Sequence, residues 1–202
     1  MSPMMRQPLT VELALLGFLR HGPLHGYEIH RQLSDPAGLG EVWRLKQSHL
    51  YALLSRLAEE GYLTSSLKPQ ETRPQRRQYR LTKIGRTTFL EWVQEPVARG
   101  RDIRLDFLTK SFFAEREGTK VATRLLHKQR VACQEWLKQQ QRQAEAARGV
   151  RPFEWKVCQF RISQIESVLA WLDLCEEQTA PISTHAGAAN AENLPDTTSM
   201  EE

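Results

Sequence analysis

Polar side chains on one face of an expected helix are the residues of this sequence best suited to contact another molecule. The helical pattern begins near Ser48 and stops at Gly61, where a left-handed residue after the helix is expected. Its apolar stripe consists of Leu50, Leu53, Leu54 and Leu57. The opposite face carries small or hydrogen-bonding side chains of the kind that can enter a DNA major groove. The residues on or beside this face are Gln47, Ser48, His49, Tyr51, Ala52, Ser55 and Arg56.

Two short extended runs follow this helix and carry concentrated positive charge. Alternation of apolar and polar residues predicts strands at 62–67 and 76–81, joined by a turn that contains Pro69 and Pro74. The only acidic residue between positions 66 and 90 is Glu71. Basic groups in such a hairpin suit DNA phosphates or the adjacent minor groove. The residues assigned to this contact are Lys68, Arg73, Arg76 and Arg77.

A basic hairpin also has a purely structural interpretation, because charged side chains protect a sheet edge from aggregation. A helix with one polar face is likewise common on any protein surface. The agreement of helix and hairpin favours nucleic acid over these alternatives.

The histidines, cysteines and hydroxyl residues form no recognisable catalytic or metal-binding motif. His21, His25 and His30 span a turn and a short helix and do not share one helical face. The three cysteines are far apart and odd in number, which disfavours a zinc site or a disulfide framework. No GxSxG sequence or glycine-rich phosphate loop occurs. We therefore expect no enzyme activity, no cofactor and no metal.

The elements that would position the polar helix and the basic hairpin lie on both sides of them. Thr10 is a plausible cap of a first helix, and a second helix is expected at Gly26–Leu33. Residues 42–45 alternate like a short strand, and Thr82 is placed to cap a fourth helix that ends before Pro96. Three helices followed by a hairpin is the order of a winged helix-turn-helix domain.

Three runs in this region resemble the PadR family of bacterial transcriptional regulators: GPLHGYEIHRQL, SHLYALLSRLAEEGYL and RRQYRLTKIGRTTFLEWV. The positions that match the family's motifs are His25, Gly26, Tyr27, Glu28, Leu50, Tyr51, Leu54, Arg56, Leu57, Gly61, Tyr79, Leu81, Thr82, Gly85 and Arg86. Ala52 and Ala58 depart from the usual pattern, which affects the expected base preference more than the fold. The resemblance implies a DNA-binding domain and a helical C-terminal region that forms a homodimer.

The sequence after Pro96 changes to long helical patterns. A connector at 97–102 leads to expected helices at 104–115, 119–148 and 153–178. The run RDIRLDFLTKSFFA is similar to the branch of PadR-like proteins akin to virulence-gene activators. The last two helices carry more apolar surface than a hairpin needs, so we expect an isologous dimer. The residues expected at the dimer interface are Leu125, Trp136, Phe160, Ile165, Leu169 and Leu172.

Charge and hydropathy bound the remaining possibilities. The net charge is +4, yet the sequence from Glu176 onward contains acids and no Lys or Arg. We expect residues 181–202 to form a disordered acidic tail. No apolar run approaches the roughly 20 residues that cross a bilayer, and no signal sequence begins the chain. A cytoplasmic protein without a membrane partner is expected.

These observations combine into one prediction of fold and function. We expect a mainly α protein with a winged helix-turn-helix domain at 1–96, a helical dimerisation domain at 97–180 and the tail. Its partners would be double-stranded DNA and a second copy, and its activity that of a homodimeric repressor on an inverted-repeat operator. A winged-helix module that binds protein and not DNA is the alternative. A small aromatic effector is a further candidate partner, although core or dimer packing is the favoured explanation of the aromatic residues Trp92, Phe107, Phe112, Trp136, Trp155 and Trp171.

Overall fold

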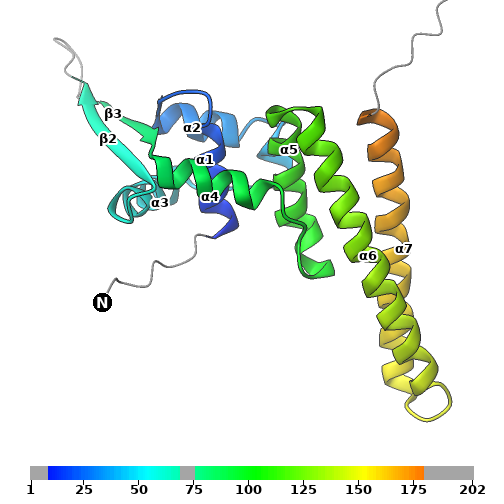
Figure 1. Ribbon diagram of the computed structural model, residues 1–202. Helices are drawn as coiled ribbons and strands as arrows, with labels where there is room; N and C mark the ends of the chain where they lie inside the picture. Colours follow the sequence, from blue (N-terminus) through cyan, green and yellow to red (C-terminus); the bar gives the residue numbers. More distant parts are fainter. Residues whose placement is uncertain (1–8, 69–75, 180–202) are drawn as a thin grey trace, which may run out of the picture.

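The computed structural model describes residues 9–68 and 76–179, which form a mainly helical protein with one small antiparallel sheet (Figure 1). The predicted fold class, a winged helix-turn-helix domain followed by helices, is confirmed. Arg73 and the predicted tail at 181–202 lie outside the described residues. The elements of the first half are α1 Thr10–Phe18, β1 Leu24–His25, α2 Gly26–Leu33, the 3₁₀ turn η1 Leu39–Glu41, α3 Gln47–Glu59, β2 Leu63–Lys68, β3 Arg76–Leu81 and α4 Lys83–Val93. The elements of the second half are η2 Gly100–Asp102, the π-helical turn η3 Ile103–Phe107, α5 Leu108–Glu117, α6 Thr119–Ala147 and α7 Pro152–Thr179.

The sheet has the strand order β1-β3-β2, with both neighbouring pairs antiparallel. The hairpin register pairs Leu63 with Leu81 and Lys68 with Arg76. The short strand β1, which the sequence pattern did not predict, pairs Leu24 with Tyr79 on the other side of β3. The central strand is therefore held on both edges, and the hairpin has a fixed orientation beside α2.

Two local predictions were wrong. The residue that caps α1 is Leu9, whose backbone N–H donates to Glu12 Oε2 at 2.7 Å, and Thr10 is already helical. Residues 42–45 form no strand; the Trp43 N–H instead donates to the Leu39 carbonyl of η1 at 2.7 Å. The Trp43 indole N–H donates to Thr109 Oγ1 at 2.8 Å, so this segment is fixed by contacts with η1 and α5.

The start of α4 explains the Thr-x-x-Gly motif. Thr82 is the predicted cap: its Oγ1 accepts the Gly85 N–H at 3.0 Å and donates to the Gly61 carbonyl at 2.8 Å. Gly85 approaches the backbone so closely that a Cβ there would lie 2.2 Å from the Tyr62 carbonyl oxygen. The absence of a side chain at Gly85 therefore allows α4 to lie close to the backbone between α3 and β2.

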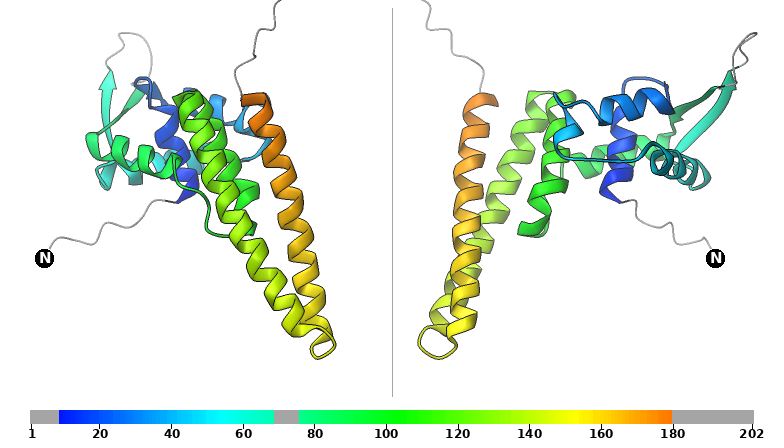
Figure 2. Two further views of the ribbon diagram at one scale, coloured as in Figure 1. Left: turned by 45° about the vertical axis from the view of Figure 1, so that its right-hand side comes forward. Right: turned by 180° about the vertical axis from the view of Figure 1, so that it is seen from behind.

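The C-terminal half is dominated by the antiparallel pair α6 and α7, which extends away from the compact part formed by α1–α5 and the sheet (Figure 2). Gly118 joins α5 to α6, and Gly149 lies in the turn between α6 and α7. Their φ angles of 113° and 70° lie in a region that favours glycine. Arg130 of α6 forms ion pairs with Asp173 and Glu176 of α7. No helix in the described ranges is both long and apolar enough to cross a membrane.

One hydrophobic core runs through both halves of the chain. Phe113 of α5 packs edge to face against Phe18 of α1 at 5.2 Å and against Phe89 of α4 at 5.6 Å, between ring centroids. Phe107 and Trp171 make a similar contact at 5.9 Å, which joins the turn η3 to α7. The domain boundary expected after residue 96 stays a prediction, since α5 shares its core with the preceding helices.

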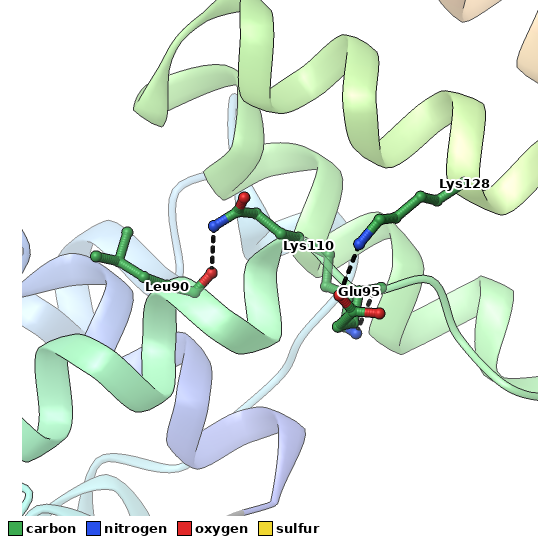
Figure 3. A network of polar contacts seen from close by, with 5 residues as sticks. Leu90, Glu95, Lys110 and Lys128 are labelled. Carbon is green, nitrogen blue, oxygen red and sulfur yellow. Dashed lines mark hydrogen bonds and ion pairs between the residues drawn. The ribbon is translucent and has the colours of Figure 1, made fainter.

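Polar contacts at the end of α4 add to this connection (Figure 3). Lys110 Nζ donates to the Glu95 carbonyl at 2.7 Å, and Lys128 Nζ donates to Glu95 Oε1 at 2.6 Å. The Val97 N–H donates to Oε1 of the fully buried Gln129 at 2.8 Å. The exit from α4 is thus bonded to both α5 and α6, which orients the winged-helix part relative to the long helices.

Three of the residues expected at a dimer interface are buried within the single chain. Leu125 and Leu172 have no exposed surface, and Ile165 is 8% exposed. Their side chains pack in the hydrophobic core of the single chain, so little of their surface is available to a partner in this conformation, and their place at a dimer interface stays a prediction. Trp136 and Leu169 are half-buried, whereas Phe160 is 63% exposed.

Candidate nucleic-acid interface

Helix α3 exposes its N-terminal half and buries its apolar stripe as expected. Leu50, Leu54 and Leu57 have no exposed surface, and Leu53 is only 2% exposed. The exposed side chains are those of Gln47, Ser48, His49, Tyr51 and Ala52, whereas Ser55 and Arg56 are half-buried. The hydrogen-bonding groups available to a ligand therefore concentrate in the first turns of α3.

The segment before α3 adds two basic side chains that the sequence interpretation did not include. Arg44 and Lys46 are both exposed, and Lys46 is the residue that precedes the first helical residue of α3. His30 Nε2 of α2 lies 3.2 Å from the Leu45 carbonyl, a hydrogen bond that fixes this segment. The two bases thus lie beside the exposed N-terminal end of α3.

Helices α2 and α3 cross where two motif residues meet. A Cβ on Gly26 would lie 2.3 Å from Cε1 of Tyr51, so the aromatic ring covers the first residue of α2. Tyr51 remains 37% exposed on its other side. Gly26 therefore permits the close crossing, and Tyr51 both packs the two helices and contributes to the exposed face.

Arg56 has a structural partner that the sequence interpretation missed. Its Nη2 lies 2.5 Å from Oε1 of Glu12, a carboxylate on α1 with no exposed surface. The Arg56 side chain is 42% exposed. This ion pair joins α3 to α1, so the position of Arg56 in the motif has a packing explanation alongside the predicted DNA contact.

The β2–β3 hairpin extends beside α2 and α3 as a wing (Figure 1). Lys68 and Arg76 are paired at the end of the ladder, and Arg77 is exposed. The His25 Nδ1 atom lies 3.3 Å from the Arg77 carbonyl oxygen, which connects the wing to the start of α2. The predicted basic residues within the described range therefore lie on one hairpin that is connected to the start of α2.

Tyr79 in the middle of β3 is a core residue with 2% exposure. Burial raises the pKa of its phenol above the ordinary value, and hydrogen bonds from Arg77 and Ser55 partly oppose that shift. The phenol is therefore neutral at physiological pH. Ser55, which was predicted to contact DNA, lies close enough to Tyr79 to help hold α3 against the sheet.

The aromatic residues considered for an effector pocket have mixed positions. Phe107 is fully buried and Phe112 packs edge to face on Phe113 at 5.1 Å, so both belong to the core. Trp92 packs against Phe89, with 6.0 Å between ring centroids. Trp136 is half-buried and lines a groove beside the connector between α4 and α5.

Comparison with known proteins identifies the domain that contains this interface. Residues 15–91 match the model of the Transcriptional regulator PadR-like family. The Negative transcriptional regulator PadR of Bacillus subtilis (strain 168) is 30% identical over 104 residues, which cover 52% of this chain and 56% of that protein. The chain thus spans about half the length of this curated relative.

Solved structures of related proteins cover more of the chain at lower identity. The crystal structure of Bacillus subtilis PadR in complex with operator DNA is 23% identical and covers 85% of this chain and 99% of that chain, with a TM-score of 0.43. The crystal structure of the same protein in complex with p-coumaric acid is 21% identical and covers 86% and 100%, with a TM-score of 0.38. The family expected from the three motif runs is confirmed, and the narrower branch stays a prediction. Residues 15–91 thus form a domain that is similar to the PadR-like family of transcriptional regulators.

Proposed function

We propose that the protein is a homodimeric repressor that binds an inverted-repeat operator through α3 and the wing. The observation that carries this proposal is the placement of exposed hydrogen-bonding side chains at the start of α3 next to a basic hairpin. A helix of this kind suits the major groove, and a basic hairpin beside it suits the flanking phosphates. The name of the Bacillus subtilis relative, a negative regulator, supports repression.

The two surfaces would contribute differently to binding. Gln47, Ser48 and His49 carry side chains that can donate to or accept from base edges, so they would determine sequence preference. Lys46 and Arg77 carry charges that suit phosphates, which all sequences share. We assign the first group to specificity and the second to salt-dependent affinity.

Dimerisation would use the outer face of α7. Phe153, Phe160 and Leu174 are 79%, 63% and 59% exposed, and their separations of seven and fourteen positions place them on one side of the helix. A stripe of large exposed apolar side chains on a surface helix suits contact with an identical stripe of a second copy. Two winged domains joined in this way would suit half-sites about 34–36 Å apart, or a multiple of that distance.

The charge contribution of the wing can be tested with a double variant. Arg76→Ala with Arg77→Ala should weaken binding to operator and to unrelated DNA alike, since phosphate contacts do not depend on sequence. Each lost phosphate contact should lower the slope of log K against log salt by about 0.9. Electrophoretic mobility shifts over a range of salt concentrations measure both effects.

A matched control separates the wing from net charge. Arg148→Ala with Arg151→Ala removes the same charge from the turn between α6 and α7, far from the wing (Figure 1). This control should keep the affinity and slope of the unmodified protein. An equal loss in both double variants would contradict the assignment of the wing, and failure of the unmodified protein to bind any DNA would favour a protein-binding module.

A further inference from the structure

A groove of about 820 Å³ lies between the connector that follows α4 and the facing sides of α6 and α7. The connector runs from the end of α4 to the start of α5, between the winged-helix part and the long helices (Figure 1). The groove has a strongly basic lining without a single acidic residue. The arginines that line it are Arg99, Arg101, Arg104 and Arg161.

Most of this charge is not neutralised within the chain. Arg101 is 71% exposed and lies 3.7 Å from Asp102, a long and solvent-screened ion pair. Arg99, Arg104 and Arg161 are exposed and form no ion pair with any residue of the described ranges. Such a cluster is electrostatically unfavourable alone, so it favours a ligand with more than one negative charge.

Arg130 of α6 and Arg151, just before α7, differ from the groove arginines in having carboxylate partners. Arg130 is held by two carboxylates of α7, and Arg151 lies 3.2 Å from Glu154. The groove arginines are therefore not explained by the ion pairing that stabilises the rest of the helical pair.

The inner wall of the groove is apolar and contains an indole ring. Trp136 of α6 lines it together with Ile165 and Val168 of α7. Trp136 and Val168 are half-buried, so part of each side chain faces the open space. A half-exposed indole beside guanidinium groups suits a flat aromatic ring that carries an anionic group.

Side-chain amides complete the lining. Gln139, Gln140 and Gln164 line the same groove. The Gln140 amide nitrogen donates to Gln143 at 3.0 Å, whereas Gln139 and Gln164 are exposed. Side-chain amides both donate and accept hydrogen bonds, so they suit a ligand with donors and acceptors on one edge, such as a purine.

We propose that this groove binds a nucleoside phosphate. The arginines would hold the phosphates through paired N–H donors, Trp136 would stack on the base, and the glutamines would contact its edge. The volume lies within the range of small-molecule sites, about 300–1,000 Å³. A single carboxylate would leave most of the arginine charge unpaired, which is why a multiply charged ligand fits better.

Fluorescence anisotropy of N-methylanthraniloyl-ATP added to the full-length protein tests this proposal. Saturable binding is expected, with a loss of roughly tenfold or more for Arg104→Ala with Arg161→Ala, because two charge-assisted contacts disappear. Trp136→Leu should weaken binding while leaving every arginine in place. The matched control is Lys120→Ala with Arg124→Ala, which removes two exposed charges from α6 outside the groove.

Competition distinguishes the chemistry of the ligand. Unlabelled ATP should displace the probe, whereas pyrophosphate and benzoate should compete much more weakly, since each has only part of the required structure. Equal competition by pyrophosphate would reduce the groove to a simple anion site, and equal competition by benzoate would indicate a monoanionic aromatic ligand; both results overturn the proposal.

Further outcomes also decide the matter. Absence of saturable binding, or equal binding by the groove and control variants, overturns the site. Weaker operator binding by the groove variant without nucleotide would assign these arginines to DNA, and a monomeric groove variant by light scattering would assign them to the second copy. Either result excludes the nucleotide site while leaving the proposed DNA-binding function intact.

Discussion

Replacement of Arg56 by alanine separates two roles that the same residue could have. The guanidinium pairs with Glu12, which has no exposed surface and also accepts the Leu9 N–H at 2.7 Å. Removing one partner of a fully buried ion pair typically lowers the free energy of unfolding by about 3–5 kcal/mol. The Arg56 side chain is 42% exposed, so solvent already screens part of this interaction. We expect a loss of about 2–3 kcal/mol of unfolding free energy.

Urea unfolding at one fixed protein concentration measures this loss, because the stability of a dimer depends on concentration. The double variant Glu12→Gln with Arg56→Ala provides the control. It should be more stable than Arg56→Ala alone, since a neutral amide at position 12 no longer needs a counterion.

DNA affinity measured well below the unfolding temperature completes the test. If Arg56 acts through Glu12, folded Arg56→Ala should retain most of its affinity for operator. Unchanged stability together with a large loss of operator affinity would refute the structural role and establish Arg56 as a DNA contact.

Three further predictions concern helix packing, pH and assembly. Gly85→Ala should lower the free energy of unfolding by about 1–3 kcal/mol, because its Cβ would lie 2.2 Å from a backbone oxygen. Gly100→Ala is the matched control, since a Cβ there meets no atom within 4 Å. Thermal unfolding of the two variants measures the difference. Burial lowers the pKa of Lys110 from 10.5 in the unfolded chain to about 8 in the folded protein. Between these two pH values the unfolded chain binds more protons than the folded protein, so the free energy of unfolding should rise with pH. Urea unfolding across that pH range should show that the free energy of unfolding rises less steeply with pH in Lys110→Met than in the unmodified protein. An equal pH dependence in both proteins would contradict the lowered pKa of Lys110. Phe160→Glu should yield folded monomers by light scattering, whereas Leu125→Glu should impair folding because Leu125 is fully buried; a dimeric Phe160→Glu protein would exclude the outer face of α7.

Local patterns in the sequence were sufficient to predict the elements around the interface. The bounds expected for α2 and β3 agree with the structure, and Thr82 caps α4 as predicted. These elements have strong local signals, namely helical periodicity, strand alternation and a capping threonine. The exposed side of α3 followed from the same periodicity, since the leucine stripe determines which side faces solvent.

Contacts between distant parts of the chain account for what the patterns did not predict. Strand β1 has only two residues and exists because Leu24 pairs with Tyr79. Glu12 resembles a solvent-facing acid in its local sequence, and only the tertiary fold brings Arg56 to it. The alternation at 42–45 suggested a strand, but no neighbouring strand pairs with this segment within the described residues.

The residues predicted at the dimer interface also show what local sequence patterns cannot predict. Periodicity identified the apolar positions of α6 and α7 but could not separate those that pack within one chain from those that remain exposed. Leu172 is fully buried, while Phe160 and Phe153 face outward. That distinction depends on how α5, α6 and α7 pack together, which the sequence pattern of any one helix does not determine.

Selection of genomic DNA fragments by the purified full-length protein, followed by hydroxyl-radical footprinting, tests the central claim most directly. We expect an enriched inverted repeat with two protected half-sites whose centres are about 34–36 Å apart, or a multiple of that distance. Exchange of His49 for alanine should change the bases preferred within each half-site without removing protection of the flanking backbone. Absence of any enriched sequence, or protection without two-fold symmetry, would contradict a homodimeric regulator that binds DNA through α3 and the wing.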